Sequence, residues 1–332
     1  MFDKGIAAVV YSVVCAAYRI SAQKRNGRSR QMKSDRNKTL DIPLSECAEY
    51  ASKCGFPRGS ISFDECEDKI YCVDFFKAAQ RLPKNSFRLI IADPPYNLRK
   101  DYDGEVFPTQ KADEYREFTR AWLAEVRRLA ADDATVYVCC DWRSSVIIAP
   151  VLEEFFVIRN RITWQREKGR GAAKNWKNCL EDIWFCTVGK EYYFDVNGVK
   201  QKRAVKAPYR ENGVPKDWEQ TESGNFRMTC PSNFWDDIAV PFWSMSENTA
   251  HPTQKPEKLI AKLVLASSAP GDRVFDPFGG SGTTAAVCKK LGRHYTVTEK
   301  SKLYCAWSEI RLEKAESDKR IQGYENGVFE KK

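Results

Sequence analysis

The segment Asp93-Pro-Pro-Tyr-Asn97 places a carboxylate, two prolines and an aromatic ring directly after the apolar run 87–92. Two prolines cannot continue a strand, so Asp93 is expected at the carboxyl-terminal tip of a buried strand. There, Asp93 and the carbonyl of Pro94 could accept both N–H groups of an exocyclic amine, which would free its ring-delocalised lone pair for attack. Tyr96 would stack on an extruded base. The candidate catalytic residues are Asp93, Pro94, Pro95 and Tyr96.

A second constellation, Val274-Phe-Asp-Pro-Phe-Gly-Gly-Ser-Gly-Thr-Thr284, joins an apolar run to a helical pattern. Gly280, Gly282 and Ala285 match the G-x-G-x-x-A spacing, in which glycines let the backbone turn tightly and approach a ligand closely. Glu299 follows at the end of the next predicted strand, where a carboxylate can bind ribose hydroxyls. The pattern indicates a nucleotide-like cofactor, and by itself it leaves NAD open.

A third string, His251-Pro-Thr-Gln-Lys-Pro256, lies between these two constellations. Taken in this order, the three strings resemble the β-group of amino-directed DNA methyltransferases. In that group the catalytic motif precedes the cofactor motif, which is a circular permutation of the usual order. The resemblance covers about residues 68–315 and implies S-adenosyl-L-methionine as the cofactor.

The resemblance also implies roles for single residues. Asp74 resembles the family's acidic residue near the cofactor adenine. Glu299 would hold the ribose, although Thr-Val-Thr-Glu stands here where Gly-Ile-Asp or Gly-Ile-Glu is commoner. Lys255 would be a counter-charge to the cofactor's carboxylate. The expected cofactor-binding residues are Asp74, Asp93, His251, Thr253, Lys255, Phe275, Asp276, Pro277, Phe278, Gly280, Ser281, Gly282 and Glu299, and no metal is expected.

The first letter of the catalytic motif bears on which base is methylated. Within the family, an aspartate there, as at Asp93, is typical of members acting on the N6 amino group of adenine. A serine is typical of those acting on the N4 amino group of cytosine, which stays as the alternative. Methylation at cytosine C5 requires a Pro-Cys pair with a cysteine nucleophile. This chain has only the reversed order, Cys230-Pro231, so that reaction is excluded.

Two further classes of protein share part of this pattern. A catalytically silent DNA-binding relative would have no need to keep Asp93, Tyr96 and the glycine turn together. An NAD-dependent oxidoreductase would leave the Asp-Pro-Pro-Tyr segment without a purpose. Both are therefore disfavoured.

The elements that must position these residues alternate along the chain. Strands are predicted at 69–74, 87–92, 135–140, 161–164, 183–187, 273–276 and 295–299. Helices are predicted at 75–82, 112–129, 145–155, after Pro256, at 283–291 closed by Gly292, and at about 303–315. The alternation predicts an α/β, Rossmann-like, circularly permuted methyltransferase fold with a mostly parallel, doubly wound sheet.

Between residues 195 and 250 neither a helical nor a strand period holds, yet aromatic residues are frequent. The family resemblance implies that sequence recognition lies between its two halves, so this stretch is the expected target-recognition insertion. Arg203, Arg210, Asn225 and Arg227 have the side chains suited to major-groove contacts. Ahead of it, basic residues interleave with Trp164 and Trp176. The expected phosphate contacts are Arg166, Lys168, Arg170, Lys174 and Lys177.

The net charge of +9 is concentrated in two places. Residues 19–38 hold eight basic side chains and one acidic, and residues 159–210 hold thirteen and five. Such clustering suggests a polyanion partner. The expected partner is double-stranded DNA, without a membrane. A homodimer and a cognate restriction endonuclease are further partners to consider.

The domain boundaries follow from these patterns. We expect a flexible basic extension at 1–60, a catalytic half at 61–194, the insertion at 195–250, a cofactor-binding half at 251–318 and a tail at 319–332. The apolar run 6–18 is shorter than the roughly 20 residues that span a bilayer. The adjacent Cys139 and Cys140 lie within an apolar run and predict buried thiols of a reducing compartment. The expected location is the cytoplasm.

Overall fold

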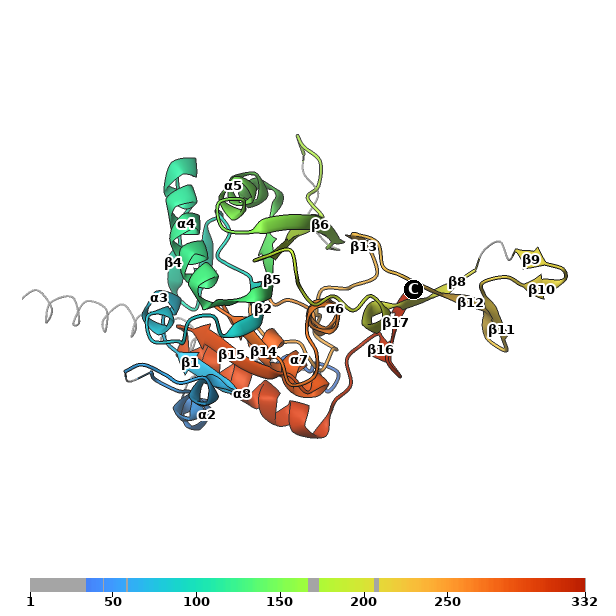
Figure 1. Ribbon diagram of the computed structural model, residues 1–332. Coiled ribbons are helices and arrows are strands. Elements are labelled where there is room, and N and C mark those ends of the chain that lie inside the picture. The colour runs from blue at the N-terminus through green and yellow to red at the C-terminus, as the bar shows by residue number, and fades with distance from the viewer. Residues whose placement is uncertain (1–33, 44, 58, 167–172, 206–208, 332) are drawn as a thin grey trace, which may run out of the picture.

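The computed structural model describes residues 34–331 except 44, 58, 167–172 and 206–208, and its centre is an eight-stranded sheet (Figure 1). In spatial order the strands are β1 (Lys69–Cys72), β15 (His294–Glu299), β14 (Arg273–Asp276), β2 (Phe87–Ala92), β5 (Ala130–Cys140), β7 (Leu180–Thr187), β6 (Val157–Gln165) and β13 (Phe234–Trp235). The first five run parallel to one another, whereas β7 is antiparallel to both β5 and β6. The predicted, mostly parallel α/β sheet is confirmed.

Helices cover both faces of this sheet. One face carries α3 (Phe75–Ala79), α4 (Ala112–Leu129) and α5 (Trp142–Leu152), and the other carries α6 (Glu257–Ser267), α7 (Thr283–Leu291) and α8 (Lys302–Ser317). Because side chains alternate along a strand, β2 sends Leu89 and Ile91 into one core and Ile90 and Ala92 into the other. The doubly wound arrangement is therefore a consequence of apolar runs that are buried on both sides.

The two halves of the chain meet at the middle of the sheet. Strand β14 pairs in parallel with β2, with Phe275 opposite Ile90. The ring of Phe275 also stacks on that of Phe87, with centroids 4.8 Å apart. Since parallel strands end at the same edge, the residues that follow β2 and those that follow β14 leave the sheet side by side.

A second sheet forms an arm that projects from the body (Figure 1). Its strands are, in spatial order, β11 (Glu219–Thr221), β12 (Gly224–Thr229), β8 (Gln201–Ala204), β17 (Val328–Lys331) and β16 (Tyr324–Glu325). A hairpin of β9 (Arg210–Glu211) and β10 (Val214–Pro215) continues the arm. Short pieces elsewhere in the described chain are η1 (Asp64–Cys66), η2 (Asn197–Val199), β3 (Lys100–Tyr102) and β4 (Glu105–Phe107).

The arm does not coincide with the predicted insertion. The predicted tail 319–332 contributes β17, which pairs in parallel with β8 and buries Phe329 completely. Conversely, the later part of 195–250 returns to the body, where β13 pairs with β6 and Trp235 is buried. Sequence pattern could not show this exchange, because strands of two to four residues carry too little periodicity.

The segment 34–57 also differs from the predicted flexible extension. Helix α2 (Ala48–Lys53) lies against α8, and Leu40 and Cys47 are buried with Trp307. Leu40 donates its N–H to Asn248 and accepts one from Ala250, which fastens the segment beside the His251 string. Residues 1–33, including the apolar run 6–18 and most of the first basic cluster, lie outside the described residues. Within the described part, no helix combines the length and apolarity needed to cross a membrane.

Candidate active site

A cavity of about 1380 Å³ opens at the edge where β2, β14, β15 and β1 end. Asp93, Pro94, Pro95 and Tyr96 line it, and so do Gly280 and Ser281 of the glycine turn. Residues that are far apart in the sequence therefore share one cleft. Pockets for a single small ligand usually hold about 300–1,000 Å³, so this one has room for a cofactor and part of a second molecule.

The Asp93–Tyr96 turn is held by the two helices on its side of the sheet. The hydroxyl of Tyr115 on α4 donates to the Pro95 carbonyl over 3.0 Å. On the other side, the Asn97 N–H donates to the Ser144 hydroxyl of α5 over 3.0 Å. Asp141 caps α5 by accepting the Ser144 N–H, which fixes that hydroxyl in turn. The turn is consequently held in place by hydrogen bonds from α4 and α5 as well as by the fixed backbone angles of its own prolines.

Both oxygens of the Asp93 carboxylate have partners in this structure. Oδ1 accepts the Tyr96 hydroxyl over 2.8 Å, and Oδ2 accepts Lys255 Nζ over 2.7 Å. Burial alone would lower the pKa of Lys255, but the carboxylates of Asp93 and Glu181 raise it above its ordinary value. Burial raises the pKa of the Tyr96 phenol, which therefore stays a neutral donor. Lys255, expected beside the cofactor's carboxylate, instead faces Asp93.

The glycine turn needs glycine for steric reasons as well as conformational ones. Gly280 and Gly282 have φ angles of +52° and +73°, in the left-handed region that side chains disfavour. A Cβ on Gly279 would lie 2.1 Å from Val297 Cγ1, and one on Gly282 would lie 2.5 Å from Ser308. The loop thus packs directly against β15 and α8. Its residues Gly279, Gly280 and Ser281 line the cavity.

Three acidic residues line the cavity at or just beyond the ends of β1, β14 and β15. Asp276 accepts the Phe278 N–H and the Thr284 hydroxyl. Glu299 accepts the Gly280 N–H over 2.9 Å and the Ser301 N–H over 2.7 Å. Burial raises the pKa of both carboxyls to about 7. Asp74 caps α3 through the Phe76 N–H, so it lies just beyond β1 rather than on the predicted strand.

These residues fit a nucleoside that carries a charged tail. The cavity wall next to Asp74 is aromatic, with Phe75, Phe76 and Phe278 among its lining, as the face of an adenine requires. Glu299 presents carboxylate oxygens suited to ribose hydroxyls. The glycine turn lets the remainder of the ligand pass close to the backbone. The site therefore fits S-adenosylmethionine without rearranging the fold.

Two residues expected at the cofactor do not line the cavity. Phe275 is fully buried in the core, where its ring stacks on Phe87, and Gly282 lies against Ser308 of α8. The other expected residues do line it, namely Asp74, Asp93, His251, Thr253, Lys255, Asp276, Pro277, Phe278, Gly280, Ser281 and Glu299. Burial and the neighbouring Lys255 lower the pKa of His251 to about 3. His251 is thus a neutral ring packed against Gly280.

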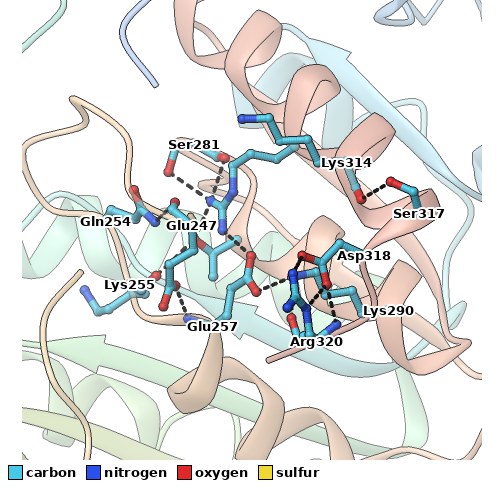
Figure 2. Close-up of polar contacts among 12 residues, drawn as sticks. Glu247, Gln254, Lys255, Glu257, Ser281, Lys290, Lys314, Ser317, Asp318 and Arg320 are labelled. Carbon is cyan, nitrogen blue, oxygen red and sulfur yellow. Dashed lines mark hydrogen bonds and ion pairs between the residues drawn. The ribbon is translucent and has the colours of Figure 1, made fainter. Parts of the chain in front are cut away.

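Arg311 of α8 joins the glycine turn to the His251–Pro256 string. Its Nη1 donates to the Ser281 carbonyl and the Thr283 hydroxyl, each over 2.9 Å, and its Nη2 donates to Glu257 over 2.9 Å. Thr283 in turn donates to the Lys255 carbonyl. Figure 2 shows Ser281, Glu257 and Lys255 gathered in this network. Sequence reasoning missed Arg311, because a single arginine in a final helix carries no signal.

Glu181 is the second residue that sequence reasoning missed. It is buried, accepts Arg166, and lies 3.3 Å from both Lys255 Nζ and the Tyr96 hydroxyl. It stands near the start of β7, and because β7 is antiparallel, that start lies at the edge where the parallel strands end. A carboxylate at the beginning of a strand becomes informative only once the strand's direction is known.

The expected phosphate contacts that the structure describes lie just after β6, in the segment that leads to β7. Lys174 and Lys177 are exposed, and Arg166 is partly exposed, whereas Lys168 and Arg170 lie outside the described residues. Trp176 is 94% exposed, which is unusual for so large a ring. Trp164 instead is buried and donates its indole N–H to the Ile238 carbonyl, so the expectation that it interleaves with the basic side chains is not met.

Of the four side chains proposed for major-groove contacts, all belong to the arm. Arg203 and Arg210 are exposed on β8 and β9, and Asn225 and Arg227 lie on β12. Arg227 forms an ion pair with Asp217 over 3.2 Å. The arm therefore presents basic and amide groups on strands that project away from the body of the molecule (Figure 1).

Comparison with known proteins gives consistent matches. The N6/N4 methyltransferase family model, described as DNA methylase, matches residues 87–310. The chain is 32% identical over 250 residues to the type II methyltransferase M.HpaI of Haemophilus parainfluenzae, covering 74% of each protein. The chain is also 32% identical over 250 residues to the DNA adenine methyltransferase YhdJ of Escherichia coli K12, and this match covers 73% of this chain and 81% of the relative.

Among solved structures, the fold is similar to that of the cytosine-N4-specific PvuII DNA methyltransferase. The TM-score is 0.56 at 17% identity, over 75% of this chain and 90% of that one. A likeness at such low identity concerns the fold alone.

Proposed function

The chain belongs to the DNA methylase family, and on that premise we propose that it transfers a methyl group from S-adenosylmethionine to the N6 amino group of adenine in double-stranded DNA. The observation that carries the proposal is the single cavity lined by both Asp93–Tyr96 and the glycine turn. A carboxylate for the amine and a cradle for the methyl donor are thereby within reach of one another.

The catalytic step draws on few groups of the chain. When bound, S-adenosylmethionine would supply an electrophilic methyl group, and its methyl carbon–sulfur bond would break as the nitrogen takes the methyl, with S-adenosylhomocysteine as the leaving group. Asp93 and the Pro94 carbonyl would each accept one N–H of the target amine, which localises its lone pair. As the nitrogen forms its new bond to carbon, it loses one proton, and Asp93 is placed to take it. Tyr96 would hold the extruded base by stacking.

The cofactor would lie along the edge from Asp74 to the glycine turn. Asp74 and the aromatic wall would hold its adenine, Glu299 its ribose, and residues 276–281 its methionine portion. Lys255 faces Asp93 in this structure, so we assign it to the catalytic carboxylate rather than to the cofactor. Arg311 supports both sides of the site through Ser281 and Thr283.

Adenine is favoured over cytosine by two observations. The motif begins with Asp93, and the Escherichia coli relative is named a DNA adenine methyltransferase. The cytosine N4 amino group is the second candidate, because both amines pose the same chemical problem.

DNA would be held by charge and read by the arm. Arg166, Lys174 and Lys177 lie between β6 and β7 and would contact phosphates. The exposed ring of Trp176 stands among them and could stack on an unpaired base. Strands β8, β9 and β12 would place their arginines in the major groove.

Methylation of unmodified DNA with isotopically labelled S-adenosylmethionine tests this proposal. Nucleoside analysis of the digested product should give N6-methyladenine, whereas N4-methylcytosine would move the assignment to the second candidate. Asp93→Ala should reduce the rate by at least about 10³-fold, because the group that accepts the amine is lost. Cofactor affinity, measured by calorimetry, should stay within about threefold. An active Asp93→Ala protein would refute the role of Asp93.

A further inference from the structure

The catalytic carboxylate is engaged on both sides. Asp93 Oδ1 accepts the Tyr96 hydroxyl and Oδ2 accepts Lys255 Nζ, at 2.8 and 2.7 Å. An amine that enters the cavity must have one of these oxygens as its own acceptor. Each oxygen keeps a second lone pair, but the bonds from Lys255 and Tyr96 draw electron density from the carboxylate and weaken it as an acceptor of the amine. Asp93 would bind the amine more strongly if one of these donors left, and that donor would need another acceptor, since an unpaired buried donor is costly.

One atom is placed to receive both donors. Glu181 Oε2 lies 3.3 Å from the Tyr96 hydroxyl and 3.3 Å from Lys255 Nζ. These distances are longer than those to Asp93, and Lys255 Nζ also donates to the Tyr96 hydroxyl over 3.0 Å, so both donors lie closer to Asp93 than to Glu181 in this structure. Its other oxygen, Oε1, accepts Arg166, which orients the carboxylate. The side chain is 6% exposed, so water competes little for it.

We propose that Glu181 is a positioning residue that takes Lys255 and the Tyr96 hydroxyl from Asp93 when the target base enters. Asp93 is then free to accept the amine. This inference rests on the proposed function and adds a residue that no motif of the sequence includes.

The charges of the site permit such an exchange. Asp93 and Glu181 are matched by Lys255 and Arg166, so moving Lys255 between the two carboxylates leaves the local charge unchanged. Burial alone would raise the pKa of Glu181, but Lys255 and Arg166 hold it below its ordinary value. Glu181 is therefore ionised at neutral pH, as an acceptor of an ammonium must be.

Glu181→Gln tests the proposal, with Asp182→Asn as its matched control. Asp182 is the next residue of β7 and is also buried, but it points to the opposite face and pairs with Thr163 and Arg161. Single-turnover methylation is measured at saturating cofactor and DNA, because product release often limits steady-state rates. We expect Glu181→Gln to be slower by about 10²-fold, and Asp182→Asn to stay within about threefold of wild type.

A defect of positioning should spare binding. S-adenosylmethionine affinity and the fluorescence of 2-aminopurine at the target position, which brightens on base extrusion, should both stay within about twofold in Glu181→Gln. Tyr96→Phe supplies a sharper test, since it removes one of the two donors from Asp93 but keeps the ring. Added to Glu181→Gln, it should raise the single-turnover rate by about tenfold, whereas a merely structural role for Glu181 predicts no such recovery.

Two results would overturn the inference. One is a Glu181→Gln rate near wild type, and the other is a double variant no faster than Glu181→Gln alone. If the glutamine variant does not fold, Glu181→Asp keeps the buried charge but withdraws the carboxylate, and Tyr96→Phe should accelerate it likewise. An active Asp93→Ala protein would count against the proposed function itself. An inactive Asp93→Ala beside a fully active Glu181→Gln would refute only the role of Glu181.

Discussion

At the scale of single residues, the cofactor end of the cavity holds carboxyls whose pKa values lie close to neutrality. Burial raises the pKa of Asp276 and of Glu299 to about 7. A carboxyl whose pKa is raised in this way stabilises the fold fully below its unfolded pKa, which is 3.8 for the aspartate and 4.5 for the glutamate, and this contribution is lost as pH rises through about 7. These two groups should therefore make the free energy of unfolding, measured without cofactor, larger at pH 5 than at pH 8.

Cofactor affinity should have the opposite dependence. Under its proposed role, Glu299 accepts ribose hydroxyls best when ionised, so S-adenosylmethionine should bind about tenfold more tightly at pH 8 than at pH 6. Calorimetric titration across this range measures the effect. Glu299→Gln should bind more weakly and lose most of the dependence, while Asp276→Asn serves as the comparison that keeps Glu299. An unchanged slope in Glu299→Gln would contradict the ribose assignment.

At the scale of elements, helix α7 begins and ends at glycines that distinguish backbone strain from steric collision. Gly282 and Gly292 have φ angles of +73° and +71°, but only Gly282 has a neighbour, Ser308, where a Cβ would lie. Gly292→Ala should cost only the strain of a left-handed residue, about 1–2 kcal/mol. Gly282→Ala adds a collision with α8, so it should lower the melting temperature further.

Cofactor binding distinguishes the same two variants. Gly282→Ala displaces the turn, and its S-adenosylmethionine affinity should fall by at least about tenfold, whereas that of Gly292→Ala should not change. Melting curves and calorimetry on both proteins check this pair of outcomes. Equal losses in both would mean that the conformation at Gly282, not its contact with Ser308, is what matters.

Several elements could be predicted to the residue. The structure places α4, β14 and α7 at the predicted bounds, because each has a plain local signal. Helix α4 has a helical stripe of apolar residues, β14 is a short apolar run, and α7 is closed by a glycine. The same reasoning located Asp93 at the tip of β2, since prolines end a strand wherever it lies. Local chemistry was sufficient at these positions.

The missed residues depend on tertiary contacts. Glu181 joins the site only because β7 runs against its neighbours, and Arg311 only because α8 crosses the glycine turn. Lys255 was expected to face the cofactor, and its approach to Asp93 follows from the packing of α6 beneath the turn. A linear pattern holds no information on any of these approaches.

At the scale of the whole molecule, the arm is anchored by strand β17. Phe329 is fully buried in the core shared with α6, and the Glu330 carbonyl accepts Lys258 Nζ over 2.8 Å. Lys258 also pairs with the buried Asp237, which follows β13. The base of the arm is thus built from three distant parts of the chain, which neither the predicted insertion nor the predicted tail anticipated.

Loss of this anchor should weaken DNA recognition more than cofactor binding. Phe329→Ala should lower the free energy of unfolding by about 3–5 kcal/mol. It should lower both the melting temperature and the affinity for the DNA target sequence. S-adenosylmethionine affinity at a temperature where the protein is folded should stay within about threefold. Val328→Ala, one residue earlier and only partly buried, is the control expected to change little. Unchanged DNA affinity in a destabilised Phe329→Ala protein would show that the arm does not read DNA.

The pairing of Ile90 with Phe275 has a consequence during synthesis. One edge of β2 acquires its neighbour only after most of the intervening chain has been translated, on the order of 10 to 40 s later at roughly 5–20 residues per second. In that interval the nascent polypeptide exposes an apolar strand edge at the ribosome, a form prone to sticking to other chains. The order of the two halves thus lengthens the interval during which a chaperone that covers apolar strand edges would protect this chain.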